Sequence, residues 1–226
     1  MAMSRLTRAP KLTFAHAALG VAVAAAAFGA QSTAHAETIG SGTPKHAVVA
    51  ADHPEVKVQA KARISAAQVL ALAKAQVGTS EDAAGGGTKF QKWYMNTPRA
   101  LETVRRDGGT RQEYLNAAWC SMFVSWVGAH SGARSMVGWD AYTVEHARWF
   151  VKNHRWGTVP KPGAVVFYSW SGSKSLDDIQ HVGFVVKDNR NGTISTIEGN
   201  TGNGTVAQRV RPTSQVVGYG YPNYTG

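Results

Sequence analysis

The hydrophobic pattern changes at Pro160, and this change limits the possible folds more than any other feature. Before Pro160, apolar residues recur at helical spacing and predict helices at residues 66–77, 100–106, 119–129 and 141–152. After it, short runs rich in Val, Ile, Thr and Tyr predict strands at residues 164–170, 182–187, 193–198, 205–211 and 216–221. Helices followed by an antiparallel sheet of about five strands indicate the α+β class.

The first 36 residues have the pattern of a secretory signal peptide. Arg5, Arg8 and Lys11 form a basic start, residues 17–30 are apolar, and Ala34-His35-Ala36 offers a cleavage site. The apolar run is too short for a membrane-spanning helix, and no second run follows. We therefore expect a secreted protein with no stable membrane anchor.

The remaining chain divides into a leader and one domain. Residues 37–63 are rich in Gly, Ala, Thr, Pro and charge without a sustained period, which is typical of a flexible segment. The domain, residues 64–226, begins with a predicted capping box between Ser65 and Gln68. The net charge is +10 for the whole chain and about +7 once residues 1–36 are removed. This charge suits an anionic partner such as a cell wall, and equally suits plain solubility.

The chain contains a single cysteine, Cys120. One cysteine excludes an internal disulfide framework and any Cys-rich metal site. Cys120 lies at the predicted start of a helix, where unpaired N–H groups and the helix dipole favour a thiolate. Because secreted proteins ordinarily pair their thiols, a lone thiol at this position favours a nucleophile over a buried structural residue.

A cysteine nucleophile needs a base within reach, and His181 is the strongest candidate. It opens an apolar predicted strand, whereas His130 is placed to cap a helix end. His146 and His154 have charged neighbours and are expected to face solvent.

Two polar residues that can orient His181, Glu198 and Asn200, follow in the next predicted strand. A connection of two or four residues places both on the face of His181, and an odd connection without a bulge separates them. With the four-residue connection 189–192, Asn200 lies opposite His181 and Glu198 lies diagonal to it. Either group can then fix the imidazole tautomer that turns the other ring nitrogen toward Cys120.

Four segments around these residues resemble a CHAP domain, the cysteine- and histidine-dependent amidohydrolase/peptidase family. The family is related to NlpC/P60 peptidases and to the papain-like fold. The segments are Ala-Trp-Cys-Ser-Met-Phe-Val-Ser-Trp at residues 118–126, Pro-Gly-Ala-Val-Val-Phe at 162–167, His-Val-Gly at 181–183 and Glu-Gly-Asn at 198–200. The resemblance covers residues 64–221.

The resemblance implies a papain-like α+β fold in which Cys120 is the nucleophile and His181 the general base. Glu198 would orient His181, and Asn200 would give further polar support. The usual substrate of the family is bacterial peptidoglycan, cut within its peptide or at the muramoyl–alanine amide. The implied reaction is amide hydrolysis through an acyl-enzyme, in a secreted protein associated with the cell wall.

The chain departs from the family pattern at two positions. Many relatives have Gln where this chain has Trp119, and many have Asp where it has Ala164. No His follows His181, which favours a CHAP domain over NlpC/P60 proper. Residues 105–115 hold only two acidic residues, so we expect no calcium site, and no other metal or cofactor.

Aromatic residues are candidates to line a substrate groove, namely Trp93, Tyr94, Trp119, Tyr168 and Trp170. A monomer is expected. The alternative function is a non-catalytic wall-binding or effector module, which would be recognised by loss of Cys120, His181 or Glu198. Nucleic-acid binding is disfavoured, because the basic residues are scattered, no recognised motif is present and the chain begins with a secretion signal.

Overall fold

The computed structural model describes residues 63–226; the predicted signal peptide and all of the predicted leader except Arg63 lie outside the described residues. The helices are α1 (Ala66–Lys74), α2 (Lys89–Met95), α3 (Pro98–Asp107), α4 (Cys120–His130), α5 (Arg134–Val137) and α6 (Thr143–Lys152). The strands are β1 (Trp156–Gly157), β2 (Val165–Tyr168), β3 (His181–Asp188), β4 (Thr193–Thr201), β5 (Thr205–Pro212) and β6 (Val216–Gly220).

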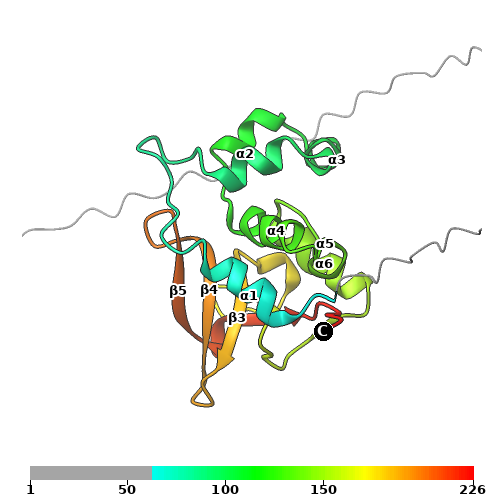
Figure 1. The fold of residues 1–226 in the computed structure, drawn as a ribbon, viewed down its shortest axis with the longest axis vertical. Coiled ribbons are helices and arrows are strands. Elements are labelled where there is room, and N and C mark those ends of the chain that lie inside the picture. Colours follow the sequence, from blue (N-terminus) through cyan, green and yellow to red (C-terminus); the bar gives the residue numbers. More distant parts are fainter. Residues whose placement is uncertain (1–62) are drawn as a thin grey trace, which may run out of the picture. The chain divides into compact units, whose positions relative to one another are not determined.

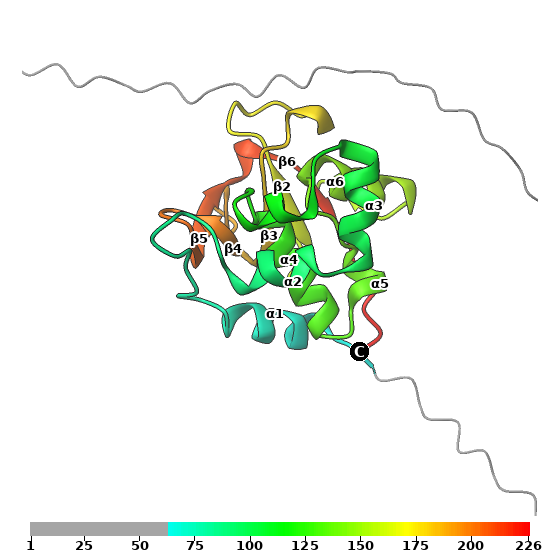
Figure 2. The same cartoon turned by 90° about the horizontal axis from the view of Figure 1, so that it is seen from above.

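The strands form one antiparallel sheet in the order β1-β6-β2-β3-β4-β5. Figure 1 shows β3, β4 and β5 side by side, and Figure 2 shows the same fold from above; both α1 and α4 pack against β3. The helices precede the sheet in the chain, which confirms the α+β class and is compatible with a papain-like fold. All five predicted strands are present, and the two-residue β1 adds a sixth at the edge.

Capping boxes start the first two helices. The predicted box of α1 is confirmed: the Ser65 N–H donates to Gln68 Oε1 at 2.8 Å, and the Gln68 N–H donates to Ser65 Oγ at 3.2 Å. Thr88 and Gln91 form the same pair at α2, a helix that the sequence analysis did not predict. None of the helices in residues 63–226 is long and apolar enough to cross a membrane.

The sheet has a packed cluster on each face. Phe123 of α4 and Phe184 of β3 belong to the cluster between helices and sheet, and Ile194 and Tyr219 belong to the cluster on the opposite face. Only Thr213–Gln215 connect β5 to β6. In a flat sheet these strands would lie roughly 19 Å apart, more than this connection spans comfortably, so the sheet curls around the second cluster.

His146, which was expected to face solvent, is fully buried between α6 and α4. Its Nε2 lies 2.9 Å from the Val137 carbonyl oxygen and its Nδ1 lies 2.9 Å from Ser121 Oγ. Because a carbonyl only accepts, Nε2 carries the proton, and Nδ1 faces the Ser121 hydroxyl, whose one proton can go to Nδ1 or to the Asp140 carbonyl. Burial lowers the pKa of His146, so the ring is held neutral. The contacts of its two nitrogens fix α6 against α4, beside Cys120.

Candidate active site

Cys120 is the first residue of α4 and is 3% exposed. Trp119 occupies the N-cap position, and no side chain caps the helix. The N–H groups of the first helical turn have no i−4 carbonyl within the helix. They therefore face the same end of α4 as the thiol and can donate to a group bound there.

Two glycines allow close packing around the site, one where β4 meets the start of α4 and one where β3 meets β4. A Cβ at Gly199 would lie 2.5 Å from the Phe123 Cβ and 2.8 Å from the Trp119 Cζ3. A Cβ at Gly183 would lie 2.7 Å from the Glu198 Cγ. Distances this short are not tolerated, so glycine is required at both positions for Glu198 to lie across β3 near the start of α4.

His181 begins β3 and is held between Glu198 and Cys120. Its Nε2 lies 3.0 Å from Glu198 Oε2. Because an ionised carboxylate only accepts, Nε2 is the donor, and Nδ1 is the ring nitrogen left for Cys120. Burial lowers the pKa of His181, but hydrogen bonds and charge interactions, first with Cys120 and then with Glu198, outweigh it and raise this pKa to about 9. His181 thus bonds to Glu198 through Nε2 and interacts with Cys120 on its other side.

Glu198 is fully buried, and its carboxylate accepts hydrogen bonds from four donor atoms on three residues. Besides His181, Thr196 Oγ1 donates to Oε1 at 2.7 Å, and Arg211 donates through Nε at 3.1 Å to Oε1 and through Nη2 at 2.6 Å to Oε2. Burial raises the pKa of Glu198, but His181, Arg211 and Thr196 together lower it to about 2. Glu198 is therefore an anion with a fixed orientation.

Arg211 was not among the predicted site residues. It lies on β5 directly across from Ile194, and its guanidinium reaches along the sheet to Glu198 and Thr201. No spacing rule in the sequence connects these residues. The only available signal was chemical. A buried carboxylate beside a buried imidazole needs further hydrogen-bond donors, and an arginine on the next strand, such as Arg211, can supply them.

The register that aligns His181 with Glu198 arises differently from the prediction. Asp188 pairs with Ile194, whereas the predicted four-residue connection 189–192 would pair it with Thr193. A bulge between Val185 and Lys187 then shifts the register back, so that Phe184 lies opposite Ile197. The bulge adds one residue to β3. His181 and Glu198 therefore share a face of the sheet, which a connection with an odd number of residues would otherwise prevent.

Asn200 makes no hydrogen bond with His181. It adopts a left-handed backbone (φ 53°) at an irregularity of β4, is partly exposed, and makes no side-chain hydrogen bond to the described residues. A residue at such an irregularity leaves the alternation that placed it opposite His181. The predicted support of the imidazole comes in this structure from Glu198 alone.

Of the residues predicted to line a substrate groove, Trp119 is buried and Trp93 packs at the end of α4 that lies away from Cys120. Trp119 is fully buried, its Nε1 donates to Glu81 Oε1 at 2.7 Å, and its ring stacks on Phe90. Trp93 contacts His130, the last residue of α4, about 15 Å along the helix from Cys120. Aromatic rings add most stability when buried, and both side chains are used for packing.

Two of the three remaining groove candidates, Tyr168 and Trp170, form a stack at His181. Tyr168 is fully buried, and its ring lies parallel to that of Trp170 at 5.7 Å. Trp170 is 43% exposed, and its ring lies 5.3 Å from the His181 ring. Trp170 is therefore the predicted groove residue that can contact a substrate. Tyr168 is buried and stacks against Trp170, and Tyr94 is a buried residue of α2.

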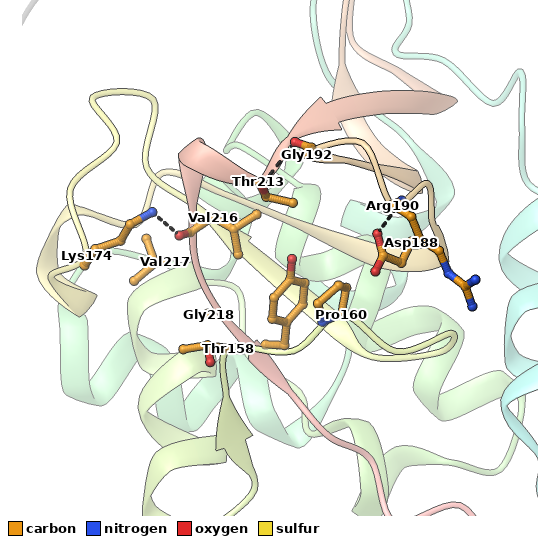
Figure 3. A pocket seen from close by; sticks show the side chains of 11 residues that line it. Thr158, Pro160, Lys174, Asp188, Arg190, Gly192, Thr213, Val216, Val217 and Gly218 are labelled. Atoms are coloured by element: carbon orange, nitrogen blue, oxygen red, sulfur yellow. Dashed lines mark hydrogen bonds between the residues drawn. The ribbon is translucent and has the colours of Figure 1, made fainter.

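In residues 63–226 no group of three or more His, Cys, Asp or Glu side chains is arranged to hold a metal ion. A hollow of about 740 Å³ lies beside β6, between the β3–β4 hairpin and Lys174, whose Nζ donates to the Val216 carbonyl (Figure 3). Neither Cys120, His181 nor Glu198 lines it. The candidate active site and this hollow are thus separate features.

Titration of the His181–Glu198 pair predicts how stability depends on pH. The pKa of Glu198 is lowered from 4.5 to about 2, so its contribution is complete above pH 4.5 and is lost as the pH falls toward 2. The pKa of His181 is raised from 6.5 to about 9, so its contribution is complete below pH 6.5 and is lost as the pH rises through 9. The pair should stabilise the fold most between pH 4.5 and 6.5.

Urea unfolding at pH 5.5, 7.5 and 9 measures this effect as the difference in unfolding free energy between the wild type and His181→Gln. We expect the difference to shrink as the pH rises. A difference that stays constant over this range would contradict the raised pKa of His181.

The family model of the CHAP domain matches residues 112–200, which include Cys120, His181 and Glu198. This match confirms the resemblance drawn from the sequence motifs. The family consists in general of hydrolases with amidase or peptidase activity. A comparison with curated proteins gave no match.

Proposed function

We propose that this CHAP-domain chain is a secreted cysteine amidohydrolase/peptidase that cleaves amide bonds of bacterial peptidoglycan. One observation carries the proposal: His181 is hydrogen-bonded to the buried anion Glu198 on one side and interacts with Cys120 at the start of α4 on the other. This is the nucleophile–base–orienter sequence that covalent catalysis requires.

In the acylation step, His181 Nδ1 holds the proton of the Cys120 thiol, which the raised pKa of His181 favours, and the thiolate attacks the carbonyl carbon of the scissile amide. Backbone N–H groups at the start of α4 stabilise the oxyanion. The Trp119 indole cannot assist, because it donates to Glu81. The imidazolium then protonates the leaving nitrogen, the C–N bond breaks, and the carbonyl carbon stays bound to sulfur as a thioester.

In the deacylation step, neutral His181 takes a proton from water as the water oxygen attacks the thioester carbon. The C–S bond breaks, the imidazolium returns its proton to the sulfur, and the acid product leaves. Glu198 keeps Nε2 protonated throughout and stabilises the imidazolium that forms twice in the cycle. Arg211 and Thr196 hold the Glu198 carboxylate in this role.

The family resemblance and the sequence support the proposed substrate and location. The family resemblance supports peptidoglycan as substrate, and the signal-like pattern of residues 1–36 supports secretion to the cell wall. The positive charge of the chain is compatible with an anionic wall. We propose that the protein acts as a monomer, without metal or cofactor.

Mass spectrometry of purified peptidoglycan digested by the protein tests this function. An amidase would separate intact stem peptides from the glycan, and an endopeptidase would leave shortened peptides on it. We expect one of these two product sets. Peptidoglycan that is bound but returns undigested would support the non-catalytic wall-binding module instead.

A further inference from the structure

A second hollow, of about 510 Å³, lies at β5 and the β4–β5 turn, next to the candidate active site. It is lined by Thr201, Gly202, Gln208, Arg209, Val210 and Arg211. Arg211 connects it to the site, because the same guanidinium that lines the hollow binds Glu198. A group held in the hollow would therefore lie one side chain away from the residue that orients His181.

Arg209 brings a second positive charge to this hollow. Arg209 and Arg211 are two residues apart on a strand, so their side chains leave the same face. The guanidinium of Arg209 packs against Gly202, where a Cβ would collide with its Nη2. Among the described residues, Arg209 has no carboxylate partner, and its Nε is buried without an acceptor.

Both guanidinium groups retain donors for an additional acceptor. Arg211 uses Nε and Nη2 for Glu198 and Thr201, which leaves Nη1 without a partner among residues 63–226. Buried donors in folded proteins are nearly always satisfied, and the Nε of Arg209 has no acceptor among the described residues. Planar guanidinium groups bind carboxylates through pairs of parallel hydrogen bonds, which suits an oxyanion in this hollow.

We propose that the hollow formed by Arg209 and Arg211 is a subsite for a carboxylate group of the substrate peptide. This assignment rests on the proposed function, because peptidoglycan stem peptides carry free carboxyl groups close to the amide bonds that are cut. Arg209 binds the carboxylate, while Arg211 binds it with one edge and holds Glu198 with the other. The subsite thus selects peptides by charge and places them beside the catalytic residues.

The test measures binding separately from catalysis. Isothermal titration with full-length Cys120→Ala protein at low salt compares two synthetic stem peptides, one with free carboxyl groups and one with the same groups amidated. We expect the free peptide to bind about tenfold more tightly, the usual effect of a charge-assisted hydrogen bond. In Cys120→Ala/Arg209→Gln protein this preference should disappear. Arg105→Gln, which removes one exposed charge on α3, is the matched control and should retain it.

Equal binding of the two peptides by the Cys120→Ala protein would overturn the subsite. A preference that survives Arg209→Gln, or that Arg105→Gln abolishes equally, would also overturn it, since general charge would then explain the effect. Failure of the proposed function is a different result: wild-type protein would leave peptidoglycan uncut, whatever the binding preference.

Discussion

Replacing Cys120 by alanine will reduce hydrolysis of purified peptidoglycan by about a thousandfold or more, while the fold is retained. The thiol is the only cysteine sulfur in the chain, so no other cysteine can form the thioester. Alanine fits the helix start, and the loss of one buried sulfur should cost only about 1 kcal/mol of unfolding free energy. Release of soluble muropeptides, followed by chromatography, measures the activity.

Met122→Leu is the matched control, because Met122 is a fully buried neighbour on the same helix and the change conserves volume. It should keep most of the activity and a similar melting temperature. Circular dichroism of both variants separates loss of chemistry from loss of folding. A Cys120→Ala protein with wild-type activity would show that cleavage does not pass through a thioester.

The elements that were predictable from sequence are those with a local physical signal. The Ser65–Gln68 box, the apolar face of α6 and the alternating strands after Pro160 each depend on residues close together in the chain. The start of α4 at Cys120 was predictable for the same reason. These signals were sufficient for the fold class, for the place of Cys120 at a helix start and for that of His181 at a strand start.

Features that depend on contacts between distant segments were missed. Trp119 is buried because the loop containing Glu81 supplies an acceptor for its indole, and nothing in the local sequence indicates this. His146 is buried because Ser121 and the Val137 carbonyl satisfy both of its nitrogens. In each case a partner from elsewhere in the fold satisfies the polar group inside the protein.

The capping box of α2 was missed for a different reason. Thr88 and Gln91 carry the same three-residue spacing as Ser65 and Gln68, but the helix that follows has only seven residues. A helix this short has little periodicity to detect and is stabilised mainly by packing, in this case of Phe90 and Tyr94.

The site was predictable in composition but not in its electrostatics. The order of Cys120, His181 and Glu198 in the sequence predicted the residues of the candidate site. It did not predict Arg211, which binds Glu198 from a strand that carries no motif. The bulge at Val186 likewise could not be read from the hydrophobic pattern, because Val185 and Val186 are both apolar and either could face the core.

Glu198→Gln will lower kcat/KM by about 10²- to 10⁴-fold, the range expected when the group that orients a catalytic histidine loses its charge. The amide has the shape of the carboxylate, but it can donate toward His181 and so permits the wrong tautomer. It also removes an anion that raises the pKa of His181, so this pKa should fall below about 9. The pH dependence of kcat/KM should change with it.

The pH profile distinguishes this role from a merely structural one. If Glu198 only stabilised the fold, the variant would lose active protein and keep the shape of the wild-type profile. The matched control is Glu113→Gln, the same change at an exposed residue that contacts Thr110, and it should leave both rate and profile unchanged.

Because Glu198→Gln leaves Arg211 without its buried anion, a loss of a few kcal/mol in unfolding free energy is also expected. The assay should therefore be run at a temperature where urea unfolding shows the variant to be fully folded. A folded Glu198→Gln protein with the wild-type pH profile would show that Glu198 does not set the protonation of His181.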